Sequence, residues 1–255
     1  MRILILLYSI SQSLTEISDS LAKKALKSKL MPTPEALKAH FSPVEYYHVV
    51  CKSIDGLLLF QDNQDFKIYK ERFKKFTGNF LDVWSFCLLN NHTHHIIKTK
   101  TSASIYKFIQ QIPKKLRTSS MNEFFEEWEN ELFYNKVIER QMNSFLVSYA
   151  TYVNNKYIRK GGIFQKPFKR IQIDGEAHLQ QAIIYTNANA QKHQMIKDYR
   201  KYPFSSYLPL VENDHQWVDA KSVLEFFNGL NNFIFTHNEQ AAYFYQKDWP
   251  LSKLE

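Results

Sequence analysis

Residues 79–100, NFLDVWSFCLLNNHTHHIIKTK, decide the fold. Residues 79–89 are apolar at both alternating positions, which is typical of a strand that is covered on both faces. Asn90 and Asn91 follow, and they predict a tight turn because asparagine tolerates the positive φ that such turns require. Residues 92–100 then predict the returning strand of a β-hairpin.

The segments around this hairpin predict further strands and helices. Residues 45–51, EYYHVVC, are rich in β-forming side chains and predict a strand, and the apolar run 56–60 predicts a second short piece of sheet. Asn63 or Asp65 can cap a helix that carries aromatic residues on its inner face. Further helices are expected at residues 103–112, 136–157, 175–190 and 219–228.

This order of elements favours an α+β fold, with a ferredoxin-like split βαβ arrangement and an antiparallel sheet. The domain is expected over residues 41–208. Residues 1–40 predict a helical N-terminal appendage, because their leucines and isoleucines recur at helical intervals before a proline-containing break. Residues 209–255 predict a helical C-terminal tail.

The composition narrows the class of partner and the compartment. The 255 residues carry a net charge of +8, which favours polyanionic partners, with nucleic acid first and anionic membrane second. Only six glycines are present, which argues against a glycine-rich nucleotide-binding loop. The two cysteines exclude a disulfide framework, so a cytoplasmic location is expected. The apolar start of the chain lacks a signal-peptide cleavage pattern, and no apolar stretch is long enough to span a membrane.

The histidines of the returning strand are candidate metal ligands. Successive side chains of a strand point to opposite faces, so His92 and His94 share one face at a spacing of roughly 7 Å, while His95 and Thr93 share the other. Two imidazoles at that spacing can converge on one ion. The alternative is a polar patch at a solvent-exposed start of the strand, because two ligands alone do not make a metal site.

Tyr185 and Asn189 offer a candidate nucleophile and a third ligand. They are four residues apart in the predicted helix 175–190, so they share a face one turn apart. A tyrosine nucleophile suits a phosphodiester attack in which the enzyme holds the DNA end covalently. The alternative is an interfacial aromatic residue, since Ile183 and Ile184 precede it. Tyr149 and Tyr152 lie on another predicted helix, where Tyr149 continues an apolar stripe and Tyr152 could contact DNA.

Residues 155–173 form a basic block without an acidic residue. Basic side chains here can neutralise a nucleic-acid backbone, and the interleaved Tyr157, Phe164 and Phe168 can stack on bases. The alternative is a solvated basic loop. The candidate DNA-binding residues are Lys156, Arg159, Lys160, Lys166, Lys169 and Arg170.

Several blocks, in order, resemble one family. YYHVV, FCLLNNHTHHIIK, GGIFQKPFKR, IIYTNANAQKH and YPFSSY resemble the conserved blocks of the REP-associated tyrosine transposases. These belong to the insertion-sequence-200-like transposases of the HUH endonuclease superfamily. The resemblance covers residues 44–208, and the ordered set is more specific than any single block.

The resemblance implies an HUH-type nuclease domain and a mechanism. His92 and His94 would be the metal ligands of a Mg²⁺ or Mn²⁺ ion, Asn189 a third ligand and Tyr185 the catalytic tyrosine. The activity implied is nicking and strand transfer of single-stranded, hairpin-forming DNA through a 5′-phosphotyrosine, in a bacterial mobile-element context. Both a monomer and a homodimer are compatible with the resemblance, and no membrane partner is implied.

Departures from the family pattern leave two other functions open. Asn90 replaces a proline, and Thr93 and His95 replace two apolar residues. The polar Thr93 and His95 predict a less well buried strand at that point. Near the tyrosine, Thr186, Asn187 and Ala190 replace isoleucine, histidine and proline. The missing histidine could be a lost ligand or general base. The alternatives are an inactive relative that binds hairpin DNA, and a metal hydrolase that uses water as its nucleophile.

Overall fold

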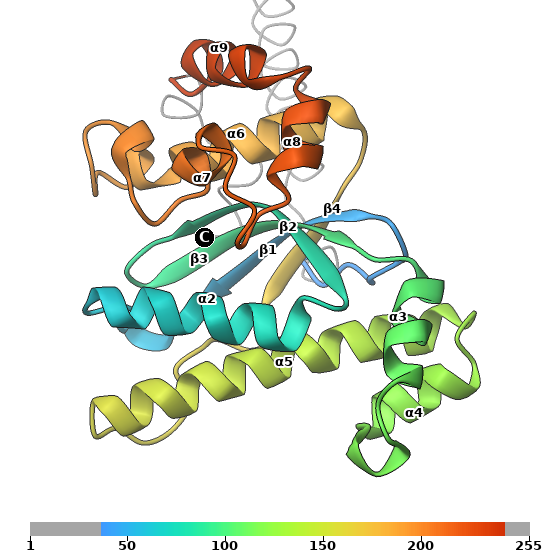
Figure 1. Cartoon of the computed structure of the whole chain (residues 1–255). Coiled ribbons are helices and arrows are strands. Elements are labelled where there is room, and N and C mark those ends of the chain that lie inside the picture. Colours follow the sequence, from blue (N-terminus) through green and yellow to red (C-terminus); the bar gives the residue numbers. More distant parts are fainter. Residues whose placement is uncertain (1–36, 243–255) are drawn as a thin grey trace, which may run out of the picture.

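The computed structural model describes residues 37–242, and its centre is a four-stranded antiparallel sheet (Figure 1). The spatial order of the strands is β2-β3-β1-β4. Helix α2 connects β1 to β2, and α5 precedes β4, which is the connectivity of a ferredoxin-like split βαβ fold. The predicted α+β fold with an antiparallel sheet is therefore confirmed. The bounds are β1 Tyr46–Lys52, α2 Asn63–Thr77, β2 Leu81–Leu88, β3 His92–Thr99, α5 Glu131–Lys156 and β4 Lys169–Ile173.

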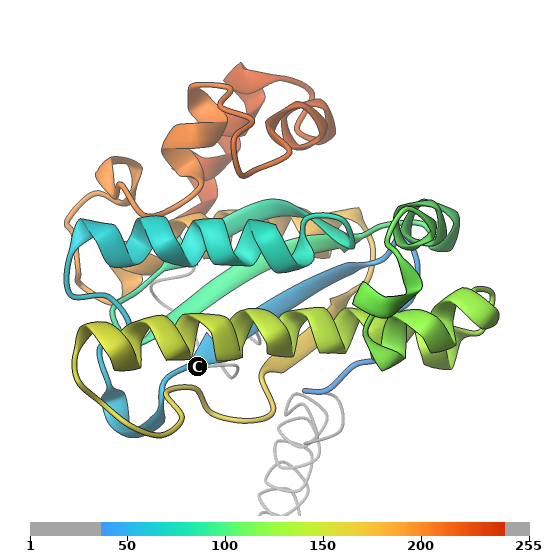
Figure 2. The ribbon, with the colours of Figure 1, turned by 60° about the horizontal axis from the view of Figure 1, so that its bottom comes forward.

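Helices cover both faces of the sheet. Helices α2 and α5 run side by side against one face (Figure 2), and α6 crosses the other face over β2 and β3 (Figure 1). Helices α7, α8 and α9 form a further layer beside α6, while α3 and α4 lie at one end of the sheet. The bounds are α3 Ser102–Gln110, α4 Ser119–Glu126, α6 Glu176–Lys192, α7 Tyr207–Val211, α8 Ala220–Phe226 and α9 Leu230–Gln240, with short 3₁₀ turns at Ile54–Gly56, Lys114–Leu116 and Tyr199–Lys201.

The predicted hairpin forms, but its turn differs from the expected one. Neither Asn90 nor Asn91 takes a positive φ. The connection is instead closed by the Leu89 amide, which donates to the His92 carbonyl at 2.9 Å. The carbonyls of Asn90 and Asn91 accept from the amides of Leu59 and Ser53, so the turn is fixed by the loop that follows β1.

Two local predictions are wrong. The apolar run 56–60 is not a strand, because Gly56 takes a φ of 67° and the chain turns there, which directs Leu59 and Phe60 into the core. Helix α2 is capped by Asp62 rather than by Asn63 or Asp65. The Asp62 side chain accepts from the Asp65 amide, and Asp65 completes a capping box.

The expectation of a poorly buried stretch at Thr93 and His95 is also wrong. Both side chains are fully buried on the face that packs on α2 and α5. The Tyr69 hydroxyl of α2 lies 2.8 Å from Thr93 Oγ1 and 2.9 Å from His95 Nε2. The polar side chains are therefore accommodated by one matching hydroxyl, because a buried polar group is tolerated where it is hydrogen-bonded.

Both outer strands are covered by backbone from elsewhere in the chain. On β2, Phe86 and Leu88 exchange backbone hydrogen bonds with residues 204–206, and the Val83 carbonyl accepts from the Asp219 amide at 2.8 Å. On β4, the Arg170 amide donates to the Leu37 carbonyl at 2.8 Å. Strand edges are the usual sites of unwanted pairing, and here the middle of each edge is occupied.

The predicted helical appendage over residues 1–40 lies outside the described residues except for its last four positions. The described part of the tail contains α7, α8 and α9, and residues 212–219 and 227–229 connect them. Leu210, Val223 and Phe233 belong to the same buried cluster as the sheet. The boundaries at 40/41 and 208/209 stay predictions. Within residues 37–242, no helix combines the length and the apolar character needed to cross a bilayer.

Candidate functional site

His92 and His94 lie together on the face of the sheet that α6 covers. Their ring centroids are 5.0 Å apart, His94 is fully buried and His92 is 6% exposed. A polar patch at a solvent-exposed strand start is therefore excluded. His95 points to the opposite face, as the strand periodicity predicts, and stacks on Phe73.

His48 of β1 is a third histidine of this site, and the sequence reasoning missed it. Its Nε2 lies 2.9 Å from Nδ1 of His94, and the two ring centroids are 5.1 Å apart. In the β1–β3 register Val50 pairs with His94, and His48 lies two residues earlier on the same face. The signal was available in the strand YYHVV, where a histidine lies among β-forming residues, but only the strand register shows which face it takes.

Helix α6 places Tyr185 against these imidazoles. Tyr185 is 1% exposed, and its ring centroid lies 6.2 Å from that of His48 and 6.1 Å from that of His94. Asn189 follows one turn later in α6 and is fully buried. Lys192, the last residue of α6, donates from Nζ to the Tyr185 hydroxyl at 2.9 Å.

His193 closes the site at the end of α6. It is the C-cap residue of the helix, and its ring centroid lies 4.9 Å from that of His92. His48, His94 and Lys192 thus lie beside Tyr185, and His92 and His193 extend the cluster from His94. Burial lowers the pKa of His94 well below its usual range, and the positive charges of His92, His48, His193 and Lys192 lower it further. His94 is therefore neutral at neutral pH and can offer a nitrogen lone pair.

The side chains near His92 and His94 determine which of the expected ions, Mg²⁺ or Mn²⁺, they suit. Within residues 37–242, no three His, Cys, Asp or Glu side chains are arranged to hold an ion. The expected ligands His92 and His94 share one face of the sheet, and Asn189 lies one helical turn after Tyr185 in α6. His92 Nδ1 lies 2.7 Å from the Asn91 amide oxygen. Imidazole nitrogen suits Mn²⁺ better than the oxygen-preferring Mg²⁺, so the set fits Mn²⁺.

The other two candidate tyrosines lie on the far side of the sheet. The Tyr149 hydroxyl is buried and donates to the Leu59 carbonyl at 2.7 Å. The Tyr152 hydroxyl donates to Asp65 at 2.9 Å. Both belong to α5, which packs on the face opposite the histidine pair. Of these three tyrosines, only Tyr185 lies beside the histidines.

Asn187 shows what the departure next to the tyrosine does. Its amide oxygen accepts from the Ser206 hydroxyl, and its nitrogen lies 3.0 Å from His237 Nε2 of α9. Ser206 also lies 2.9 Å from the Ser85 hydroxyl of β2. Position 187 therefore joins α6 to β2 and α9 through a buried polar network, and the side chain there is directed to this network rather than to His92 and His94.

The six basic candidates separate into paired and accessible residues. Lys156 forms ion pairs with Asp62 at 2.7 Å and Asp65 at 2.6 Å, and Arg170 is buried against Glu139. These two side chains join parts of the chain to one another. Lys160 and Lys166 are exposed, whereas Arg159 and Lys169 are half-buried.

The aromatic residues of the basic block are not arranged as a stacking platform. Phe164 and Phe168 are 5% and 3% exposed and belong to the core, and the Tyr157 hydroxyl donates to Asp65 at 2.6 Å. The expectation that Phe164 and Phe168 stack on bases is therefore wrong, whereas for the half-buried Tyr157 it stays a prediction. A sequence pattern that alternates basic and aromatic residues also arises when the aromatic residues face inward.

Lys169 and Lys52 form a basic pair on the histidine face. Lys169 pairs with Val50 in the β1–β4 register, and Lys52 pairs with His92 in the β1–β3 register, so both point to the side of the sheet that carries His92 and His94. Burial lowers the pKa of Lys169, and the positive charge of Lys52 lowers it further. Lys52 was not predicted, because only the register places it here.

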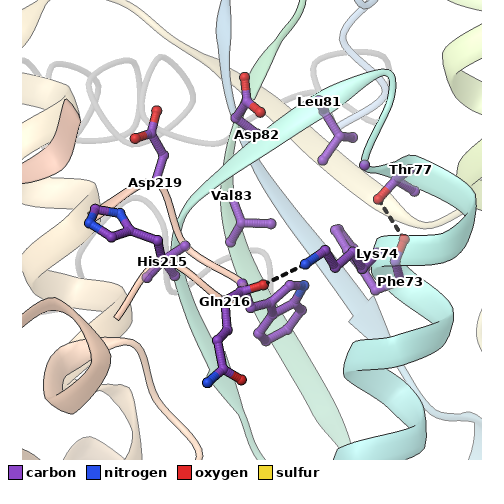
Figure 3. Close-up of a pocket in the computed structure, with 12 residues that line it drawn as sticks. Phe73, Lys74, Thr77, Leu81, Asp82, Val83, His215, Gln216 and Asp219 are labelled. Carbon is purple, nitrogen blue, oxygen red and sulfur yellow. Dashed lines mark hydrogen bonds between the residues drawn. The ribbon is translucent and has the colours of Figure 1, made fainter. Parts of the chain in front are cut away.

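A separate pocket of about 270 Å³ lies on the outer side of β2 (Figure 3). It is enclosed by the end of α2, the start of β2 and residues 215–219, and Lys74 Nζ donates across it to the Gln216 carbonyl at 2.9 Å. Asp82, His215 and Asp219 border it (Figure 3). None of the histidines or the tyrosine of the candidate site lines this pocket.

Comparisons with known proteins give structural neighbours only. No protein-family model matches the chain. No curated protein matches it by sequence. One similar solved structure is a REP-associated tyrosine transposase bound to a REP hairpin, with a TM-score of 0.45, 13% identity and coverage of 71% of this chain and 87% of that chain. Another is a bacterial tRNA(His) guanylyltransferase-like protein in complex with ATP, with a TM-score of 0.37, 12% identity and coverage of 78% of this chain and 77% of that chain.

Proposed function

We propose that this chain is a tyrosine transposase that nicks single-stranded DNA at hairpin-forming sites and transfers the strand through a 5′-phosphotyrosine. The observation that carries this proposal is the position of Tyr185 against the imidazoles of His48 and His94, with the Lys192 ammonium at its oxygen. The order of the sequence blocks supplies the reaction class.

In the proposed reaction, the Tyr185 oxygen attacks the scissile phosphorus and releases a 3′-hydroxyl. A second strand end with a free 3′-hydroxyl reverses the step, and this completes strand transfer. Tyr185 is nearly fully buried, so the reacting phosphate must enter between α6 and the sheet, where little water competes as a nucleophile.

The proposed metal ligands are His92, His94 and Asn189. A bound Mn²⁺ would polarise the scissile phosphate and offset charge in the transition state. The Asn91 amide fixes the His92 tautomer, and His48 can accept a hydrogen from Nδ1 of His94, which leaves Nε2 of both rings as ligands.

The DNA backbone is proposed to lie across the basic pair Lys52 and Lys169 and the exposed Lys160 and Lys166. The first two point to the same side of the sheet as His92 and His94. Ammonium groups there neutralise phosphates next to the scissile one, and this binding weakens as salt rises.

The test of the proposal is a covalent adduct. The full chain is incubated with labelled single-stranded hairpin oligonucleotides and Mn²⁺, and a denaturing gel is used to detect a protein–DNA band. We expect the band with the wild-type chain and its loss with Tyr185→Phe, which removes only the hydroxyl. Tyr152→Phe, a matched change on the far side of the sheet, should leave the band.

Other outcomes favour the two alternatives. Hairpin binding without any adduct, across the hairpins tested, would make the chain a DNA-binding module. Metal-dependent cleavage without a covalent intermediate would indicate a hydrolase that uses water. An adduct that survives in Tyr185→Phe would remove Tyr185 as the nucleophile and make Tyr149 and Tyr152 the next residues to substitute.

A further inference from the structure

Lys192 donates a hydrogen bond to the hydroxyl of Tyr185, the proposed nucleophile. It lies seven residues after Tyr185 in α6, which is two helical turns and about 10.5 Å along the axis, on the same side of the helix. Its side chain extends back toward Tyr185, so that Nζ lies 2.9 Å from the hydroxyl oxygen and 4.9 Å from the ring centroid. Lys192 therefore contacts the reacting atom itself.

A cation at this position has a chemical consequence because the oxygen is buried. Tyr185 is 1% exposed, and negative charge on a buried oxygen is costly unless a donor or a positive charge compensates it. A hydrogen bond from an ammonium to an anionic oxygen is about twice as strong as one between neutral groups. The rings of His48 and His94 lie 6.2 and 6.1 Å from the Tyr185 ring, and Lys192 donates to the Tyr185 oxygen.

We propose that Lys192 is a further catalytic residue, which stabilises the negative charge on the Tyr185 oxygen during attack and again when that oxygen leaves. This inference rests on the proposed function of Tyr185. In the forward step the bond from the Tyr185 oxygen to phosphorus forms, and the bond from phosphorus to the 3′ oxygen breaks. The phenolic proton passes to water, the 3′ oxygen takes a proton from water, and Lys192 keeps its protons throughout.

The same contact acts in both directions of the reaction. In strand joining, the 3′-hydroxyl attacks the phosphotyrosine and the Tyr185 oxygen leaves with a negative charge, which the Lys192 ammonium again offsets. Nicking and joining should therefore be slowed by the same factor when the ammonium is removed. A lysine that only bound DNA would change the affinity for DNA instead.

The experiment compares Lys192→Met and Lys192→Arg in the full chain, with Mn²⁺ and a labelled hairpin oligonucleotide. Single-turnover adduct formation gives the rate at saturating DNA and the DNA concentration for half-saturation. We expect Lys192→Met to be about a hundredfold slower at saturation, with little change in half-saturation. Lys192→Arg should restore most of the rate, because arginine also donates with a positive charge. Lys197→Met, a change at an exposed lysine nearby, should match the wild type.

A second substrate tests which oxygen Lys192 serves. Sulfur in place of the bridging 3′ oxygen gives a leaving group that needs no proton. We expect the Lys192→Met defect to persist on this substrate, since the residue acts on the tyrosine oxygen. If sulfur abolishes the defect, Lys192 protonates the leaving group and the inference is overturned.

The outcomes separate this inference from the proposed function. Absence of any wild-type adduct overturns both. A wild-type adduct with an equally fast Lys192→Met variant overturns only the role of Lys192. A defect confined to the DNA concentration for half-saturation makes Lys192 a DNA contact and overturns the inference. If Lys192→Arg restores none of the rate, the lost group is not a donated positive charge, and the inference is overturned as well.

Discussion

At the scale of single residues, the histidine stretch of β3 contains two different kinds of histidine. His92 and His94 face α6, His48 and Tyr185, whereas His95 is held by the Tyr69 hydroxyl on the other face. The strand period separates these roles from sequence alone. It cannot supply His48, because the partner of a strand residue depends on the pairing register.

The contact between His48 and His94 leads to a prediction on metal affinity. His48 can fix the tautomer in which Nε2 of His94 is a ligand. We expect His48→Phe to weaken Mn²⁺ binding by about tenfold to a hundredfold, as loss of a hydrogen-bond partner of a ligand usually does. The affinity is measured by titration of Mn²⁺ followed by electron paramagnetic resonance, without DNA. Equal affinities of the variant and the wild type would remove His48 from this role.

At the scale of elements, the helices that follow the sheet show where sequence patterns no longer predict the bounds of an element. The strand β3 and the helix α6 were predicted from their patterns, and α6 ends at Lys192, two residues after the expected end. Helix α9 lies within the predicted helical tail, but its bounds were not predicted, since its inner face combines Phe233 with the polar residues Thr236 and His237. A polar residue on an inner face has meaning only once its partner is known, and that partner is Asn187 of α6.

His237 makes the docking of α9 sensitive to acid. Burial lowers its pKa to about 3, although the Phe233 carbonyl opposes this shift. Because the pKa is depressed in the folded state, the unfolded chain takes up the proton first, and stability falls as pH drops below about 6.5 toward 3. We expect His237 alone to reduce the free energy of unfolding by about 2 kcal/mol between pH 7.5 and pH 5.

The check is urea unfolding at both pH values. His237→Gln should lower the stability at pH 7.5 but show a smaller loss on acidification than the wild type. His215→Gln, at an exposed position, should keep the wild-type dependence. An unchanged dependence in His237→Gln would show that other groups carry the effect.

At the scale of the whole molecule, the two faces of the sheet carry different kinds of side chain. The face under α2 and α5 holds an aromatic core that includes Tyr69, Phe73 and Tyr149. The face under α6 carries the histidines, the tyrosine and the basic pair Lys52 and Lys169. The net charge of +8 indicated a polyanionic partner but not a surface. Lys156 and Arg170, which the sequence offered as DNA contacts, form ion pairs within the chain. Lys52, which the sequence did not offer, lies on the histidine face because it pairs with His92 in the strand register.

This division predicts how DNA binding depends on salt. If Lys52 and Lys169 contact phosphates, replacing both with alanine should weaken hairpin binding and reduce the slope of log affinity against log salt by about 0.7 for each lost contact with a single strand. Lys67→Ala changes an exposed lysine of α2 behind the sheet and should leave the slope unchanged. Fluorescence anisotropy at several salt concentrations measures both, and equal slopes would place the DNA elsewhere.

The covered edges of the sheet limit how two copies can meet. On the β2 edge, outward backbone groups are already hydrogen-bonded to residues 204–219, at Val83, Phe86 and Leu88. On the β4 edge, Arg170 is hydrogen-bonded to residues 37–39. A second copy cannot add a strand there without first peeling away one of those segments. Self-association through residues 37–242 should therefore join side-chain surfaces, and it should be reversible by salt or mild detergent rather than take the form of strand exchange.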